Sequence, residues 1–362
     1  HVSHRRPAEV VVGLNARDPQ WHDAYRLNIE TGEMWLLLQH NRFKEVIFDD
    51  DYRIRFAVQA RADGGSDLFV GWPGEWRLWD TIPFEDALTT RIVEIARAGT
   101  AVVMTDSRGR DTAALCEVGP ETKERRVLAE DPRVDVGEVV RHPTGRYPLA
   151  ASFTYDRKRW KVLEPAVEED FAVLSAQEGE FSVESQSADN TIWVVRQTAD
   201  DRPARFSLYD RKSRKITPLF STRRVLEDYP LAKMHSVVVR AQDGLDLVCY
   251  YTLPVWSDRR RPGIPDKPLP LILIPHGGPW GRDVWDFNPN HQWLASRGYA
   301  VLSVNFRSST GFGKAFINAG NHQWGKKVIS DQHDAVRWAV AEGIADPKRI
   351  GVYGGSFGGY SA

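Results

Sequence analysis

The stretch that decides the fold lies at residues 349–360 and reads Arg-Ile-Gly-Val-Tyr-Gly-Gly-Ser-Phe-Gly-Gly-Tyr. Its first five residues predict a strand, which runs directly into Gly354-Gly-Ser-Phe-Gly358, a match to the pattern G-x-S-x-G. In that pattern small residues flank a serine on a sharp turn, whose unusual backbone angles lift the hydroxyl above the edge of the sheet. The stretch therefore predicts a nucleophilic serine, Ser356.

A second motif, His276-Gly-Gly-Pro279, follows an apolar strand predicted at 271–275. Glycine backbone at this point can direct N–H groups at a developing oxyanion, and the N–H of Phe357, the residue after the serine, would supply another donor. The alternative is that the two glycines only let the chain turn. Since both motifs occur in the order that hydrolases with this elbow use, we favour the oxyanion loop.

The partners of the serine are expected outside this chain. A serine nucleophile needs a histidine base and a carboxylate that orients it, and in α/β-hydrolases both follow the serine. Only six residues follow Ser356, so the triad Asp and His are not in this chain. His276 belongs to the oxyanion loop and is a weak candidate for the base. His322 and His333 are predicted surface or capping residues.

Two acidic residues, Asp331 and Asp334, lie near the start of a helix predicted at 328–342. We interpret them as favourable charge at the N-terminal end of that helix rather than as catalytic acids.

The first two strands predicted after residue 233 are joined by the turn Gln242-Asp-Gly244, whose Asp-Gly pair suits a tight hairpin. From residue 271 onward strands alternate with helices, which implies a parallel, doubly wound sheet. The predicted strands are 234–241, 245–253, 271–275, 299–305 and 349–353, with helices at 289–297 and 328–342. The segment 234–362 is expected to be the N-terminal part of an α/β-hydrolase catalytic domain.

Residues 1–233 show short strands and polar turns, a pattern typical of all-β domains. One strand-turn-strand pattern recurs around Leu27, Leu115 and Leu208, and the spacing between occurrences is about twice the 40–50 residues of a propeller blade. Weaker patterns at 75–79 and 151–155 fill the gaps. The segment is therefore expected to be a partial β-propeller of about five four-stranded units, and a β-sandwich with long hairpins is the alternative.

The composition argues against several classes of function. Lys plus Arg number 48 and Asp plus Glu 49, so the net charge of −1 provides no field to attract nucleic acid or an anionic membrane. The apolar stretch 269–275 is too short to span a bilayer, and the first twenty residues lack the apolar core of a secretion signal. We expect no nucleic-acid partner and no membrane partner.

Cys116 and Cys249 are expected to be buried free thiols, since both lie in apolar, strand-like runs. The low cysteine count suits a reducing, cytoplasmic location. No pair of His or Cys residues has convincing ligand spacing, so neither a metal nor a cofactor is predicted. The chain begins with His1 and stops at Ala362, and we expect it to be a fragment.

Five motifs together resemble the prolyl oligopeptidase family of serine peptidases, most closely its dipeptidyl aminopeptidase and acylaminoacyl peptidase branch. They are Asp243-Gly-Leu245, His276-Gly-Gly-Pro279, Asn305-Phe-Arg-Ser-Ser-Thr-Gly-Phe-Gly313, Asp346-Pro-Lys-Arg-Ile350 and Gly354-Gly-Ser-Phe-Gly-Gly-Tyr360. The resemblance is strongest at 234–362, and the upstream repeats look like the family's β-propeller.

The resemblance implies that Ser356 is the nucleophile and that the backbone N–H groups of Gly278 and Phe357 form the oxyanion hole. It carries over no triad Asp or His, because no positions here correspond. Many members have glycine where this chain has Ser308. No paired-glutamate motif that would bind a free peptide N-terminus is found, so aminopeptidase specificity is not predicted.

The expected function is that of a serine peptidase, which cleaves peptide or acyl-peptide bonds through an acyl-enzyme while a propeller limits access. An esterase-type α/β-hydrolase passes through the same kind of tetrahedral intermediate and is one alternative. An inactive binding scaffold is the other. The isolated fragment is expected to be nearly inactive, because removal of one triad member can cost as much as removal of all three.

Overall fold

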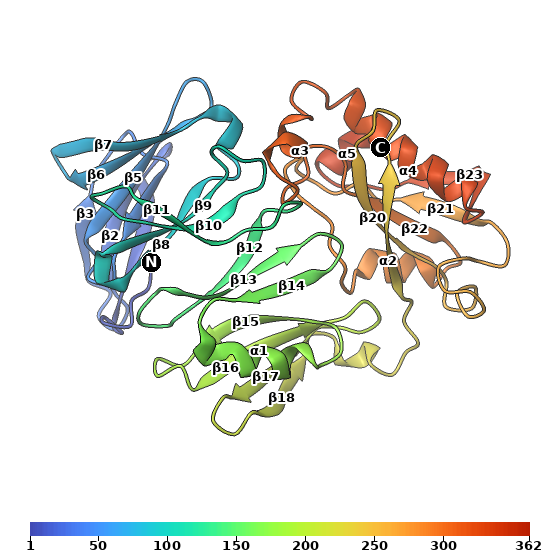
Figure 1. The fold of residues 1–362 in the computed structure, drawn as a ribbon, viewed down its shortest axis with the longest axis horizontal. Helices are drawn as coiled ribbons and strands as arrows, with labels where there is room; N and C mark the ends of the chain where they lie inside the picture. The colour runs from blue at the N-terminus through green and yellow to red at the C-terminus, as the bar shows by residue number, and fades with distance from the viewer. The chain divides into compact units, whose positions relative to one another are not determined.

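The computed structural model describes every residue of the chain, 1–362. Five antiparallel sheets follow one another as blades of a β-propeller, and a sixth, mixed sheet with helices follows them (Figure 1). The chain divides into two compact units, 1–130 with 141–149, and 131–140 with 150–362. The first three blades lie in the first unit. Most of the fourth blade, the fifth blade and the mixed sheet lie in the second.

The three blades of the first unit are antiparallel meanders. Blade 1 contains β1 (Glu9–Asp18), β2 (Trp21–Asn28) and β3 (Met34–Leu38). Blade 2 contains β4 (Glu45–Phe48), β5 (Ile54–Ala60), β6 (Ser66–Trp72) and β7 (Glu75–Ile82). Blade 3 contains β8 (Arg91–Ala96), β9 (Ala101–Asp106), β10 (Ala114–Val118) and β11 (Arg125–Ala129).

Alternation along β5 shows why these strands stack as blades. Successive side chains of a strand point to opposite faces of its sheet. Phe56 and Val58 are buried in a cluster with side chains of blade 3, whereas Ala57 between them belongs to a cluster with side chains of blade 1. Both faces of blade 2 are therefore apolar and covered, as propeller packing requires.

Blades 4 and 5 are joined by a helix that the sequence interpretation missed. Blade 4 contains β12 (Val136–Arg141), β13 (Pro148–Thr154) and β14 (Lys158–Val162). Blade 5 contains β15 (Glu180–Gln186), β16 (Ile192–Thr198), β17 (Arg205–Asp210) and β18 (Lys215–Ser221). The helix α1 (Glu168–Ser175) lies between them and buries Phe171 and Leu174, which are three residues apart on one helical face.

The predicted repeat is confirmed in number and corrected in detail. Leu27 lies in β2 of blade 1, Leu115 in β10 of blade 3 and Leu208 in β17 of blade 5, so the patterns mark every second blade. Five units are present. Blades 1 and 4 have three strands each, however, so the expectation of four strands in every unit was wrong for these two.

The mixed sheet begins after blade 5. Its strands are β19 (Met234–Arg240), β20 (Asp246–Thr252), β21 (Leu269–Leu273), β22 (Ala300–Val304) and β23 (Ala345–Val352). Its helices are α2 (Pro289–Ala295), α3 (Lys314–Asn318), α4 (Lys327–Ala341) and α5 (Phe357–Ser361). Four short 3-10 helices, η1 (Phe84–Asp86), η2 (Arg97–Gly99), η3 (Pro165–Val167) and η4 (Arg224–Leu226), occur in the loops of the blades. We keep 1–233 and 234–362 as a proposed division into domains, because the blade meanders end with β18.

The strand order is β19-β20-β22-β21-β23. β19 and β20 form the antiparallel hairpin that the sequence predicted, and β21 pairs in parallel with both β22 and β23, as their alternation with helices predicted. β20 pairs antiparallel with β22, so the whole sheet is mixed. From β21 the chain moves one position through α2 to β22, and then two positions in the opposite direction through α4 to β23. Because such connections are right-handed, this reversal puts α2 and α4 on opposite faces of the sheet (Figure 1).

The reversal creates a switch point at the carboxyl ends of β21 and β23, the place where open α/β sheets bind their ligands. No helix is long and apolar enough to cross a bilayer. Cys116 and Cys249 are free and buried, as the sequence predicted.

Candidate active site

Ser356 lies on a strained turn between β23 and α5. Its backbone angles are φ 54° and ψ −126°, a region that a residue with a β-carbon rarely adopts. The side chain is exposed, whereas Phe357, the next residue, is buried. The turn therefore presents the serine hydroxyl to solvent at the end of a sheet strand, as the G-x-S-x-G pattern predicts.

Close backbone contact explains the glycine that follows the turn. A β-carbon on Gly358 would lie 2.1 Å from the carbonyl oxygen of Pro275, at the start of the loop after β21. Only glycine allows α5 to approach this loop so closely. The contact joins the two predicted motifs in space.

The loop after β21 faces the serine. A β-carbon on Gly277 would lie 3.6 Å from Cβ and 4.0 Å from Oγ of Ser356, so the glycine leaves room beside the hydroxyl. Gly278 has φ 132°, and a β-carbon there would lie 2.5 Å from the backbone nitrogen of Trp280. The N–H of Phe357 is the first of α5 and has no carbonyl of its own helix to donate to.

His276 is held by groups other than Ser356. Its Nδ1 lies 2.8 Å from the carbonyl oxygen of Gly277 and its Nε2 lies 2.8 Å from Oγ of Ser309. The ring also stacks on Phe306 with the two centroids 4.2 Å apart. Burial lowers the pKa of His276 below the ordinary value of histidine. These contacts position the loop and leave no ring nitrogen for the serine proton.

The structure confirms the prediction for two histidines and corrects the one for two acidic residues. His322 and His333 are exposed, as expected. Asp331 and Asp334 do not lie in the first turn of a helix, because α4 begins at Lys327, and both carboxylates are buried. The interpretation of these two residues as charge at a helix N-terminus was therefore wrong.

Asp331 accepts hydrogen bonds from a buried arginine, Arg307, whose role the sequence analysis missed. Nε and Nη2 of Arg307 lie 2.9 and 2.6 Å from the two carboxylate oxygens of Asp331. The same guanidinium donates to both oxygens of Asp243 at 2.9 and 3.0 Å. Hydrogen bonds from Arg307 and Lys327 hold the pKa of Asp243 far below its usual range. The network ties the β19–β20 turn and the loop after β22 to α4.

Asp334 has a separate structural role. Its carboxylate accepts the backbone N–H of Gln242 at 3.0 Å and pairs with Arg337 on the next turn of α4. Asp243 and Arg307 each lie in a motif that resembles the family, and this was the only sequence signal for their network with Asp331. Ion pairs between distant segments leave no local pattern in the sequence.

Comparison with known proteins shows which family this chain resembles. Residues 285–362 match the prolyl oligopeptidase family. The chain is 42% identical to dipeptidyl aminopeptidase BIII of Pseudoxanthomonas mexicana over 363 residues, which are 99% of this chain and 53% of that protein. Through residues 285–362 the chain thus matches the prolyl oligopeptidase family, and over its whole length it is similar to a dipeptidyl aminopeptidase.

Other members extend the comparison. The chain is 33% identical to dipeptidyl peptidase family member 6 of Caenorhabditis elegans over 97% of its own length and 51% of that protein. A puromycin-hydrolysing peptidase of Mycobacterium tuberculosis has the same fold, with a TM-score of 0.69 at 18% identity, over 100% of this chain and 58% of that one. The chain thus spans about half the length of the curated relatives it matches.

Ser308 is the position at which the family resemblance leads us to expect glycine. Its φ is 86°, in the left-handed region that favours glycine. The residue is fully buried and its hydroxyl has no hydrogen-bond partner. The local backbone therefore keeps the conformation suited to glycine although the residue carries a side chain.

Two further titratable groups lie behind the oxyanion loop. Burial, together with the charge of Asp286, raises the pKa of Asp283 to about 7, and its Oδ2 is buried without a partner. Burial lowers the pKa of His291 to about 3, and its ring lies 3.0 Å from both Thr252 Oγ1 and Ser303 Oγ. Neither group touches Ser356, so we assign them to the framework of the site.

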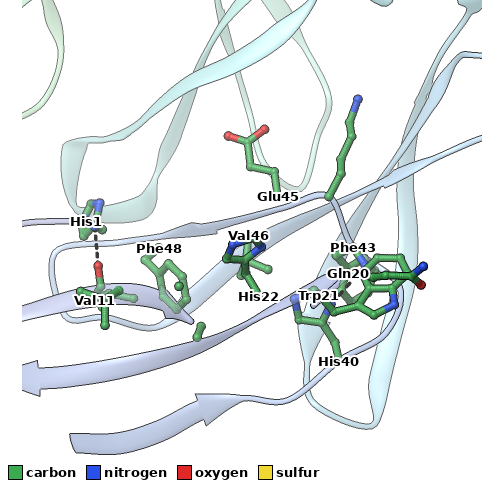
Figure 2. Close-up of a pocket in the computed structure, with 14 residues that line it drawn as sticks. His1, Val11, Gln20, Trp21, His22, His40, Phe43, Glu45, Val46 and Phe48 are labelled. Atoms are coloured by element: carbon green, nitrogen blue, oxygen red, sulfur yellow. Dashed lines mark hydrogen bonds between the residues drawn. The ribbon is translucent and has the colours of Figure 1, made fainter. Parts of the chain in front are cut away.

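A pocket of about 460 Å³ lies apart from these residues, in the first unit between blades 1 and 2 (Figure 2). Trp21, Phe43 and Phe48 supply much of its apolar lining. His40 accepts the backbone N–H groups of Arg42 and Phe43 through Nδ1 at its edge. The pocket contains no residue of the serine turn or of the oxyanion loop, and we assign it no part in the chemistry.

Proposed function

We propose that the intact protein is a serine peptidase that cleaves peptide or acyl-peptide bonds through an acyl-enzyme on Ser356. The observation that supports this most directly is the contact of two motifs far apart in the sequence. Gly277 lies beside the hydroxyl of a serine held in a strained turn. An exposed hydroxyl next to a glycine-lined loop with free N–H groups suits acyl transfer.

In the proposed reaction, Oγ of Ser356 attacks the substrate carbonyl carbon and loses its proton to a histidine base. The N–H groups of Gly278 and Phe357 donate to the negative oxygen of the tetrahedral intermediate. The intermediate collapses, the C–N bond breaks, and the base returns its proton to the leaving amine. Water then attacks the acyl-enzyme, releases the acid product and restores the serine.

We propose that residues 1–362 alone are nearly inactive. The support is that His276 is held by Gly277 and Ser309, while His322 and His333 are exposed. Removal of the histidine base lowers kcat about as much as removal of the whole triad, by roughly a millionfold in subtilisin. We expect the triad Asp and His to lie in the part of the longer protein that this chain does not include.

Access of substrates is proposed to be limited by the propeller, and the substrate is proposed to be a peptide. These proposals rest on the relatives, whose names describe a dipeptidyl aminopeptidase and a dipeptidyl peptidase family member. A cytoplasmic location is also a proposal, supported by two free, buried cysteines.

A fluorophosphonate probe tests the nucleophile in the full-length protein. We expect stoichiometric labelling of Ser356 and no labelling of the Ser356→Ala variant, with both proteins equally folded by circular dichroism. Labelling of a different residue would contradict the assignment. Turnover of aminoacyl arylamides against short acyl esters then decides between a peptidase and an esterase, since an esterase would cleave only the esters.

A further inference from the structure

Arg282 lies four residues after Gly278 and connects the oxyanion loop to blade 4. Both segments belong to the second compact unit. Nη2 of Arg282 donates to the carbonyl oxygens of Thr154 and Tyr155, each at 3.1 Å, at the turn between β13 and β14. The guanidinium also lies over the ring of Phe312, 4.3 Å from its centroid.

The acceptors of Arg282 are carbonyl oxygens rather than carboxylates, and its Nε is buried without a partner. Burial lowers the pKa of this guanidinium. Arg282 is half-buried, and a guanidinium that loses part of its hydration without a hydrogen-bonded carboxylate is costly. Because Arg282 contributes little to stability, we look for its role in the position of the segments that it joins.

The segment that Arg282 holds is short and tightly folded. The carbonyl oxygen of Gly281 accepts the N–H of Thr310 at 2.8 Å. Asp283 exchanges two hydrogen bonds with the side chain of Asn305, at 2.8 and 3.1 Å. Residues 281 and 283 are thus bonded to the loop that follows β22, while Arg282 between them is bonded to blade 4.

The tight turn from Gly278 to Gly281 transmits the position of Arg282 to the oxyanion loop. A β-carbon on Gly278 would lie 2.5 Å from the backbone nitrogen of Trp280 and 2.9 Å from that of Gly281, so the turn has little room to change shape. The receiving turn in blade 4 is itself fixed, because Tyr250 of β20 donates its hydroxyl to the carbonyl oxygen of Asp156 at 2.8 Å.

We propose that Arg282 is a positioning residue for the oxyanion hole, through which blade 4 sets the direction of the Gly278 N–H. This inference rests on the proposed function of the serine turn. It implies that the propeller is part of the catalytic geometry as well as a limit on access. Small displacements of an oxyanion donor matter because its stabilisation of the transition state depends on distance and direction.

The test uses the full-length protein and compares Arg282→Met with Arg157→Met. Arg157 is the matched control, since it extends from the same turn of blade 4 and stacks on Trp285 at 3.5 Å, beyond the segment that leads to Gly278. Active sites are counted with the fluorophosphonate, and kcat and KM are measured per labelled site. Binding of a peptide aldehyde, which forms a tetrahedral adduct on the serine, reports on the oxyanion hole.

We expect Arg282→Met to lower kcat per labelled site by about 10- to 100-fold with KM changed by less than about twofold. Affinity for the aldehyde should fall in parallel. Arg282→Lys should recover part of the loss, because an ammonium group still donates to carbonyl oxygens but lacks the planar fork. Arg157→Met should lower the melting temperature and leave kcat per site unchanged.

An unchanged kcat per labelled site in Arg282→Met, or an equal loss in Arg157→Met, would overturn the proposal. If Arg282→Met does not fold, Phe312→Leu replaces it as the test. This variant removes the aromatic ring under the guanidinium and leaves the hydrogen bonds of Arg282 in place, and the proposal requires that it also lower kcat per labelled site. A wild-type protein that neither reacts at Ser356 nor turns over any arylamide or ester would instead refute the proposed function.

Discussion

Gly358 and Pro275 join the two halves of the candidate site, since a methyl group on Gly358 would come within 2.1 Å of the carbonyl oxygen of Pro275. One residue belongs to the helix after the serine and the other to the loop after β21. Their contact fixes the serine turn against the loop that carries Gly277 and Gly278.

Gly358→Ala should therefore disrupt the site. The added methyl group cannot fit without moving α5 away from the loop, and overpacking of this kind typically costs about 1–3 kcal/mol. We expect a lower melting temperature and loss of fluorophosphonate labelling at Ser356. Gly355→Ala is the matched control for stability, because a β-carbon there meets nothing within 4 Å. Equal stability of the two variants would show that the contact is unimportant.

Ser308→Gly should stabilise the protein. A left-handed backbone costs a residue with a β-carbon about 1–2 kcal/mol, and a buried hydroxyl without a partner costs about 1–3 kcal/mol. Glycine removes both costs, although it loses about 0.5–1 kcal/mol through a more flexible unfolded chain. We expect a net gain of about 1 kcal/mol in urea unfolding. Ser308→Ala removes only the hydroxyl, so its stability should lie between those of the wild type and Ser308→Gly. A lower stability of Ser308→Gly than of the wild type would contradict this prediction.

Arg307→Met should destabilise the protein by about 3–5 kcal/mol, because it leaves the buried carboxylate of Asp331 without its partner. Adding Asp331→Asn should recover part of the loss by removing the unpaired charge. Asp243→Asn should cost less, since the side chain of Asp243 is 39% exposed and water can replace the arginine. Urea unfolding of the wild type, of Arg307→Met, Asp331→Asn and Asp243→Asn, and of the double variant checks this order. Additive losses in the double variant would show that Arg307 and Asp331 do not interact.

Asp283 should make stability depend on pH. Its pKa is about 7 in the folded protein against about 4 in an unfolded chain. Between these values the folded state holds a proton that the unfolded state has lost, so stability falls as pH rises from about 4 to about 7. Asp283→Asn lacks this proton and should show a flatter profile of unfolding free energy over that range. Parallel profiles would mean that the pKa of Asp283 is not raised.

Several features were predictable because their signals are local in sequence. The Gly354–Gly358 stretch predicts a strained turn wherever a strand precedes it, since the backbone angles of Ser356 require small neighbours. Strand alternation and the recurring pattern around Leu27, Leu115 and Leu208 predicted the blades. Helix α1 was missed because its apolar face is only two turns long and is surrounded by strands.

The sequence by itself determined the propeller followed by a hydrolase sheet, the serine turn and the resemblance to the prolyl oligopeptidase family, because hydrophobic periodicity and glycine spacing act between near neighbours. Only the tertiary structure decided that Asp331 pairs with Arg307, that His276 is held by Gly277 and Ser309, and that Arg282 reaches blade 4. These partners come from segments up to 128 residues apart, and the chain carries no local mark of which distant carboxylate or carbonyl oxygen a buried cation will meet.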